Sequence, residues 1–195
     1  MPNGTQAQQF VVASATAVVP QNPVQLTSLS DDRFSVGIAA SSFDVGAAVQ
    51  LQTTNTSDAQ LFKFTSVGNG LYSISNLNSG KAIEAASGGM TDGTAVRQWI
   101  PNGTLAQLWT LRDEGNEQQI GIANAESGLV LDVPHGKPGN GTNLQIYRQN
   151  GTVAQAWGRQ LWSPRVVYLS VLQVSFVTTP PMQWFRLDLR NLIGR

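Results

Sequence analysis

Short runs of alternating apolar and polar residues follow one another along the chain. The segments "LYSISNL" (71–77) and "TNLQIY" (142–147) alternate apolar and polar positions, and "LVLDV" (129–133) is a short β-rich run. Alternation with a period of two predicts strands that are buried on one face. Turn-forming groups such as "NSG" (78–80) and "ESG" (126–128) separate these runs. Because no segment has the periodicity and caps of an amphipathic helix, the pattern predicts an all-β protein.

The pattern repeats along the chain. Its landmarks recur 47 and 48 residues apart in three sets, namely Gln60, Gln107 and Gln155; Val49, Val96 and Leu144; and Val36, Ile83 and Leu131. Agreement of three independent sets in one register indicates a true internal repeat. Each repeat holds about four short strands, so three repeats give about twelve, which is typical of a closed all-β architecture.

Each repeat ends in a similar phrase: "TNTSDAQLFKF" (54–64), "PNGTLAQLWTL" (101–111) and "QNGTVAQAWGR" (149–159). Three copies of Gln-x-Trp or Gln-x-Phe at this spacing resemble the ricin B-type lectins and the family 13 carbohydrate-binding modules. The resemblance covers residues 21–162. It implies a β-trefoil with repeats at about 21–66, 67–113 and 114–162, and a non-catalytic function in binding polysaccharide or glycan.

The two ends of the chain lie outside these three repeats. A further copy of the phrase, "PNGTQAQQF" (2–10), precedes them, and we interpret residues 1–20 as the end of a preceding lectin repeat followed by a linker. This interpretation predicts that the chain is part of a larger multidomain protein. Residues 163–195 lack every landmark and are basic and apolar. Whether they begin another domain, are a remnant or are a translation artefact stays open.

Two aromatic positions recur in the repeats with different expected roles. The aromatic residue of Gln-x-Trp is predicted to lie in the core, because three large side chains near one axis bury much apolar area: Phe62, Trp109 and Trp157. The other position comes three residues after the Val/Leu anchor and is predicted to face outward by strand alternation. It is occupied by Gln52, Trp99 and Tyr147. An outward ring can stack on the apolar face of a pyranose.

The resemblance implies a sugar site in the third repeat. An Asp at a strand end can accept hydrogen bonds from two vicinal hydroxyls, and a charged acceptor makes the stronger bonds. The expected carbohydrate-binding residues of this repeat are Asp132, His135, Gln145, Tyr147, Asn150 and Gln155.

The other two repeats depart from the pattern. The second is expected to form a weaker carbohydrate site from Glu84, Trp99, Asn102 and Gln107, because Glu replaces Asp and Arg97 replaces the expected Gln. The first has Gly37 and Gln52 at the positions of the carboxylate and the ring, so no binding is expected there. Galactose-binding plant lectins have Asn before the Gln-x-Trp glutamine, whereas this chain has Ala in all three copies. The identity of the sugar therefore stays open.

Composition excludes several other classes of partner. The formal net charge is zero at pH 7, which argues against nucleic-acid binding. The chain has no cysteine and one histidine, so neither a transition-metal site nor any other cofactor is expected. The longest apolar segment, "VVYLSVLQVSFV" (166–177), is too short for a membrane span of roughly 20 residues. No signal peptide is visible, and a secreted or cell-surface location is inferred from the resemblance alone.

Catalysis is not expected of residues 21–162. Asp132 and Glu84 resemble the carboxylate pair of a glycosidase, but equivalent positions in different repeats would be held far apart. No nucleophile elbow or phosphate-binding loop is present in the sequence. The alternative to carbohydrate binding is a β-trefoil that serves as a protein-interaction or spacer domain with degenerate sugar sites.

Overall fold

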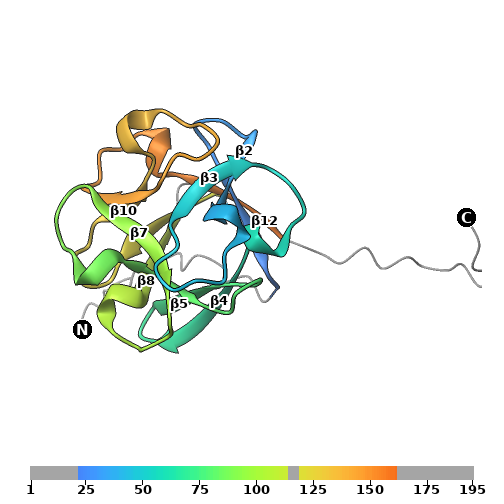
Figure 1. Ribbon diagram of the computed structural model, residues 1–195. Helices are drawn as coiled ribbons and strands as arrows, with labels where there is room; N and C mark the ends of the chain where they lie inside the picture. Colours follow the sequence, from blue (N-terminus) through green and yellow to red (C-terminus); the bar gives the residue numbers. More distant parts are fainter. Residues whose placement is uncertain (1–21, 114–118, 162–195) are drawn as a thin grey trace, which may run out of the picture. The chain divides into compact units, whose positions relative to one another are not determined.

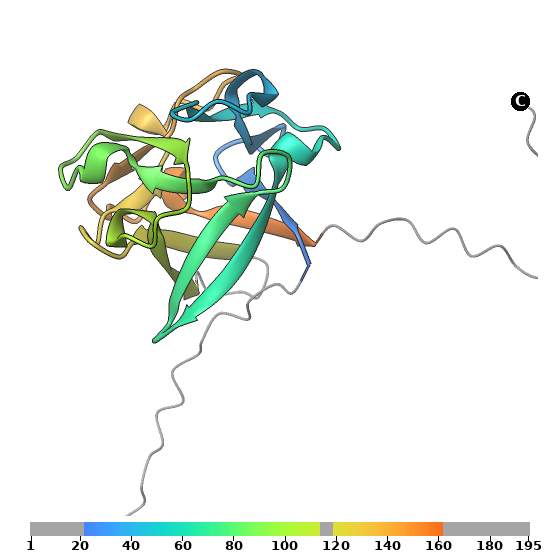
Figure 2. The same cartoon turned by 60° about the horizontal axis from the view of Figure 1, so that its bottom comes forward.

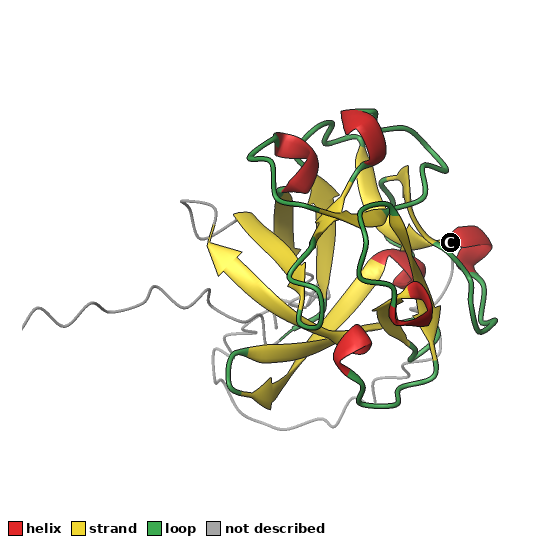
Figure 3. Cartoon of the chain, turned by 90° about the vertical axis from the view of Figure 1, so that its left-hand side faces the viewer, coloured by secondary structure: helices red, strands yellow, loops and turns green. Residues whose placement is uncertain are grey.

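The computed structural model of the chain describes residues 22–113 and 119–161, which form an all-β fold (Figure 1). The sequence-based assignments of residues 1–20 and 163–195 fall outside the described residues. Short 3-10 turns connect the strands within each repeat (Figure 3). In the described part of the chain, no helix has the length and apolar character needed to cross a membrane.

Each repeat contributes four strands, as the sequence predicts. The first repeat has β1 (Val24–Ser28), β2 (Phe34–Ile38), β3 (Val49–Thr53) and β4 (Leu61–Gly68). The second has β5 (Leu71–Asn76), β6 (Ala82–Ala85), β7 (Thr94–Trp99) and β8 (Leu108–Asp113). The third has β9 (Gln119–Asn124), β10 (Val130–Asp132), β11 (Gln145–Tyr147) and β12 (Trp157–Leu161).

The first and last strands of the three repeats close into a barrel. Antiparallel pairing runs from β1 to β4, β5, β8, β9 and β12, and β12 returns to β1, where Val24 lies opposite Leu161. Figure 2 shows the long hairpin of β4 and β5 and, beside it, the orange β12 next to the blue β1. Closure pairs the barrel strands on both sides and so removes exposed sheet edges.

The middle strands of each repeat form three hairpins, β2–β3, β6–β7 and β10–β11. These hairpins contact one another: β11 pairs with β7, and isolated bridges join Ala48 to Arg97 and Gln50 to Asn143. One six-stranded barrel and three such hairpins, built from three repeats of four strands, form a β-trefoil. The fold class predicted from the repeat is therefore confirmed.

The core contains the aromatic residues of the repeated phrase. Phe62, Trp109 and Trp157 are fully buried, as predicted. The indole Nε1 of Trp157 donates to the carbonyl oxygen of Leu131 at 3.3 Å, and Trp109 makes the same bond to Ile83 at 3.2 Å. Each acceptor immediately precedes a carboxylate residue, so each core tryptophan positions the strand end that carries the carboxylate.

Candidate functional site

The hairpin of β10 and β11 places the polar residues of the third repeat side by side. Its register sets Asp132 opposite Gln145 and Val130 opposite Tyr147. Facing residues in an antiparallel pair lie close enough for their side chains to interact. Accordingly, Nε2 of Gln145 donates to Oδ2 of Asp132 at 2.7 Å.

Gln155 joins this carboxylate to the loop that follows β11. Its Nε2 donates to Oδ1 of Asp132 at 3.1 Å and to the carbonyl oxygen of Arg148 at 2.9 Å. Its Oε1 accepts the backbone N–H of Asn150 at 2.8 Å. Gln60 and Gln107 bind their own loops in the same way, through Asn55 and Asn102. The glutamine of the repeated phrase is thus a structural brace in every repeat.

Asp132 is buried but retains the capacity to accept further hydrogen bonds. Only 4% of the residue is exposed, and each carboxylate oxygen receives one donor, from Gln145 or Gln155. Loss of solvation raises the pKa of the Asp132 carboxyl above its ordinary value, although these two amides and the charge of nearby His135 act against the rise. Each oxygen still has a lone pair for a ligand hydroxyl.

A cavity of about 730 Å³ opens in front of this carboxylate. Five of the six residues predicted for the third repeat line it, and these are Asp132, His135, Gln145, Tyr147 and Asn150. The sixth, Gln155, lies behind Asp132 with 5% exposure and acts through its hydrogen bonds. Ser30 of the first repeat and Gly93 of the second are among the other residues of its walls. The volume falls in the range of small-molecule sites.

Asn150 has a smaller capacity for ligand contact than its exposure suggests. Its Oδ1 accepts the backbone N–H of Thr152 at 3.0 Å and the Thr152 hydroxyl at 2.7 Å. Gly151 between them has φ +70°, a conformation that favours glycine. The Asn-Gly-Thr phrase is therefore a turn closed by its own asparagine side chain. The amide Nδ2 is the group that remains for a ligand.

His135 occupies an unusual backbone conformation at the pocket wall. Its φ is +57°, and Ala40 and Ser87 at the equivalent positions have φ values of +53° and +55°. Left-handed backbone at a residue other than glycine carries strain and must be held by its surroundings. All three copies keep this turn three residues after the carboxylate position, so the turn belongs to the fold. The exposed imidazole is what distinguishes the third copy.

The second repeat holds the other edge of the pocket. Asp92 precedes β7, and its carboxylate accepts the backbone N–H of Arg148 at 2.7 Å and the guanidinium Nε at 2.5 Å. The guanidinium lies 5.8 Å from the centroid of the Tyr147 ring. The two contacts between Asp92 and Arg148 join residues 56 positions apart, and no local sequence pattern predicts them.

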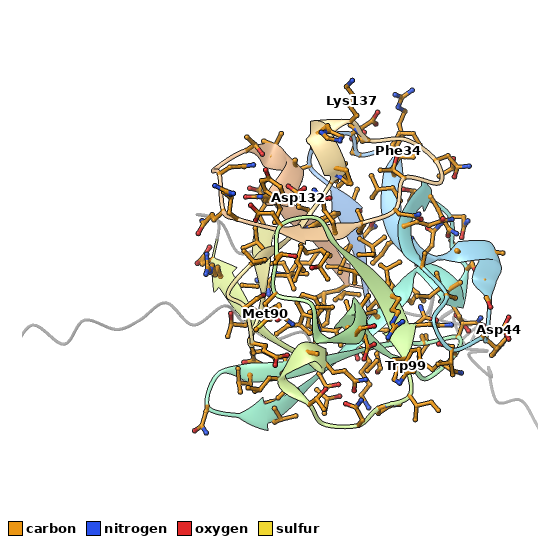
Figure 4. The ribbon with its side chains drawn as sticks, turned by 60° about the vertical axis from the view of Figure 1, so that its left-hand side comes forward. Phe34, Asp44, Met90, Trp99, Asp132 and Lys137 are labelled. Atoms are coloured by element: carbon orange, nitrogen blue, oxygen red, sulfur yellow. The ribbon has the colours of Figure 1, made fainter. Side chains whose placement is uncertain are left out.

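The second repeat brings its predicted residues together but fills the site itself. Glu84 faces Arg97 across the hairpin, and Nε and Nη2 of Arg97 both lie 3.0 Å from Oε1 of Glu84. Gln107 donates to the other oxygen at 3.0 Å. The Arg97 guanidinium also stacks on Trp99, 4.1 Å from the ring centroid. Figure 4 shows Trp99 on a different part of the fold from Asp132.

In the first repeat, Gln52 takes the space of a carboxylate. A Cβ on Gly37 would collide with Oε1 of Gln52. This same oxygen accepts a hydrogen bond of 3.4 Å from Gln60 Nε2, and Nε2 of Gln52 donates to the carbonyl oxygen of Ile38 at 3.0 Å. The side chain of Gln52, at the position that carries the aromatic ring in the other repeats, thus lies where the third repeat has its carboxylate.

Two buried asparagines, Asn76 and Asn124, support the fold and were not predicted from the sequence. Asn76 Nδ2 donates to the carbonyl oxygen of Ala59 at 3.0 Å, and Asn124 Nδ2 donates to that of Ala106 at 3.1 Å. Each asparagine ends a barrel strand and fixes the turn before the Gln-x-Trp glutamine of the preceding repeat. Their 48-residue spacing was the available signal. Within residues 22–113 and 119–161, no group of His and acidic side chains is arranged to hold a metal ion.

Comparisons with known proteins agree with this geometry. A family model described as ricin-type beta-trefoil lectin domain-like matches residues 6–99 and 105–168. The designed three-fold symmetric protein ThreeFoil is 26% identical, with a TM-score of 0.68 over 70% of this chain and 96% of ThreeFoil. The exo-β-1,3-galactanase 1,3Gal43A from Clostridium thermocellum is 25% identical, with a TM-score of 0.70 over 74% of this chain and 31% of the galactanase.

A further structure shares the fold alone. The Macrolepiota procera ricin B-like lectin, solved in complex with lactose, is 18% identical with a TM-score of 0.63, over 75% of this chain and 99% of that lectin. No curated protein matches the sequence. The family model covers well over half of the chain, and the three repeats form the fold it describes. The chain therefore belongs to the ricin-type β-trefoil lectin domain-like family.

Proposed function

We propose that this chain binds carbohydrate, without catalysis, through one pocket on its third repeat. The observation that carries the proposal is the contrast between the three equivalent carboxylate positions. Asp132 faces an open cavity, Glu84 is paired with Arg97, and Gly37 is covered by Gln52.

The pocket has the chemistry that sugar recognition needs. The two oxygens of Asp132 accept hydrogen bonds from vicinal hydroxyls, and the Tyr147 ring packs on the apolar face of the pyranose. Nδ2 of Asn150 donates to a ring substituent, while Gln155 holds the carboxylate and the loop in place. One shallow site of this kind binds weakly, with a Kd on the order of mM to tens of µM.

Galactosides are the first ligands to test. A galactanase and a lactose-bound lectin are among the similar structures. Ala154, which lines the pocket, replaces the Asn that galactose-binding plant lectins have before this glutamine. The wall at this point is apolar, which favours a sugar with fewer polar substituents on that side.

An isosteric substitution tests the site. Asp132→Asn keeps the shape of the side chain and removes its charge, and we expect it to weaken binding of galactose and lactose about tenfold or more in isothermal titration calorimetry. The matched control is Glu84→Gln at the equivalent position of the second repeat, which is expected to leave affinity unchanged. Binding that survives Asp132→Asn, or that is lost with Glu84→Gln, contradicts the assignment.

Occupation of two of the three sites by the protein's own side chains favours one rival function. A β-trefoil with degenerate sites can serve as a protein-interaction or spacer domain. A glycan array on which the chain binds no sugar at all would support this rival and overturn the carbohydrate proposal.

The proposal extends to a role within a larger protein. The similarity to the galactanase spans 31% of that enzyme, as expected for a module beside other domains. We propose that this chain delivers an attached protein to a polysaccharide or glycan, in a secreted or cell-surface setting. Several modules in tandem would raise avidity by increasing the effective concentration of sites.

A further inference from the structure

A second cavity of about 200 Å³ lies next to the Asp132 pocket and has no role in the function proposed above. It shares Thr152 and Val153 with that pocket, and its remaining walls include Gln119, Gly121 and Gln155. The segment 149–156 therefore borders both cavities.

One cross-strand pair has smaller side chains in the third repeat than in the other two. In the first repeat Gln25 lies opposite Leu61, and in the second Ser73 lies opposite Leu108. In the third repeat Trp157 lies opposite Ile120, and extending that register by one residue brings Gly121 opposite Ala156. The third repeat thus has smaller side chains at this pair than the other two repeats, and both Gly121 and Ala156 line the cavity.

The first repeat shows which group this position accommodates. The buried Gln25 donates from Nε2 to the carbonyl oxygen of Asn55 at 2.6 Å and to Oε1 of Gln60 at 3.1 Å. The equivalent acceptors in the third repeat are the carbonyl of Asn150 and Oε1 of Gln155. Gln155 Oε1 accepts the N–H of Asn150 and keeps a second lone pair. In the first repeat, the corresponding lone pair of Gln60 Oε1 accepts the hydrogen bond from Gln25.

We propose that the second cavity is a further carbohydrate subsite that accepts a hydroxyl or amide N–H donor from the sugar residue next to the one in the Asp132 pocket. This inference rests on the proposed function. A ligand donor takes the place that Gln25 Nε2 has in the first repeat. The cavity is large compared with the ~30 Å³ that a water molecule occupies in the liquid, so a hydroxymethyl or acetamido group fits.

Gln155 links the two subsites chemically. Its Nε2 donates to the carboxylate of Asp132, and Gln155 also lines the second cavity, where the analogy with Gln60 assigns its Oε1 as the acceptor. Because one amide group serves both, a ligand that spans the segment 149–156 fixes Gln155 from both sides. The structure thereby favours oligosaccharides over monosaccharides.

The test compares galactose with a β-1,3-linked galactotriose in isothermal titration calorimetry. One added hydrogen bond of ordinary strength predicts that the wild type binds the trisaccharide about threefold to tenfold more tightly. Ala156→Leu restores the side chain size of the other repeats and lines only the second cavity. We expect this variant to bind both sugars with the affinity of galactose. Gly121→Gln, which recreates Gln25, is expected to do the same.

The outcomes separate the two proposals. Equal affinity of the wild type for both sugars, or full trisaccharide preference in Ala156→Leu, overturns the second subsite alone. Loss of galactose binding in Ala156→Leu also overturns it, provided that thermal unfolding shows an intact fold. Galactose binding that resists Asp132→Asn overturns the Asp132 site of the proposed function, failure to bind either sugar overturns galactosides as its ligands, and either result overturns this inference as well.

Discussion

Arg97 binds Glu84 at the place where, in the third repeat, Gln145 binds Asp132. Both pairs face each other across a hairpin, with donor–acceptor distances of 3.0 Å and 2.7 Å. The Gln145 amide reaches one oxygen of Asp132, whereas the cation over the Tyr147 ring is Arg148, 5.8 Å from the ring centroid. The longer guanidinium of Arg97 reaches Glu84 and also lies over Trp99, 4.1 Å from the ring centroid. The two repeats therefore differ in whether the pair across the hairpin also covers the aromatic residue of the site.

Removal of this guanidinium should open the second site. In the double variant Glu84→Asp with Arg97→Gln, the pair matches Asp132 and Gln145, and the Trp99 ring loses its cation–π partner. We expect the stoichiometry of galactoside binding to rise from one to two sites per chain. Isothermal titration calorimetry measures this number directly. A stoichiometry that stays at one, with the fold intact, would show that other features close the second site.

A matched change should create a site in the first repeat. Gly37→Asp alone is expected to destabilise the protein, because its side chain collides with Gln52. Adding Gln52→Tyr removes that collision and supplies the ring, and Gln50 already occupies the position of Gln145. The double variant should recover stability in thermal unfolding and gain one binding site. A double variant no more stable than Gly37→Asp would count against the steric explanation.

Binding should depend on pH through Asp132. Burial raises the pKa of its carboxyl, so the charged acceptor is lost on acidification at a higher pH than for an ordinary Asp. Affinity for galactosides should fall as the pH drops through this raised pKa. NMR titration of the carboxyl and calorimetry at several pH values measure the two curves, which should coincide. The weaker binding of Asp132→Asn should show no such step.

The contribution of Asp132 to the stability of the fold should change with pH in the opposite direction to its contribution to affinity. Because the pKa of Asp132 is higher in the folded than in the unfolded state, folding favours the protonated form. This contribution is present in full below the unfolded pKa and is lost as the pH rises through the folded pKa. The free energy of unfolding of the wild type, relative to Asp132→Asn, should therefore increase on acidification in chemical denaturation. A relative increase toward neutral pH would contradict the direction of the shift.

The two core tryptophans offer a test of how the core supports the site. Trp157→Phe removes the hydrogen bond to Leu131 and leaves that buried carbonyl without a donor, at a cost of about 1–3 kcal/mol. Trp109→Phe does the same at Ile83 and should cost a similar amount in chemical denaturation. Only Trp157→Phe should also weaken sugar binding, because Leu131 precedes Asp132. Equal effects of both variants on affinity would contradict this local coupling.

The sequence by itself determined the repeat register, the four strands of each repeat and the burial of Phe62, Trp109 and Trp157. Five of the six residues that it predicted for the third repeat line one cavity, and the sixth, Gln155, contacts Asp132 without lining that cavity. These features follow from local periodicity: alternation shows which side chains face inward, and recurrence at 47 and 48 residues aligns the copies. These patterns are visible in the sequence because equivalent positions of the three repeats are buried in the same core.

The sequence ranked the three copies, but only the tertiary structure shows which side chains fill the first and second sites. Arg97 lies on Trp99 and Glu84, and Gln52 fills the space beside Gly37, through side-chain conformations that residue spacing does not specify. The Asp132 pocket is also lined by Ser30 and Gly93 from the other two repeats. Chain closure brings these residues together from distant positions. Periodicity thus predicts the scaffold, whereas competition for space between repeats determines where a ligand can enter.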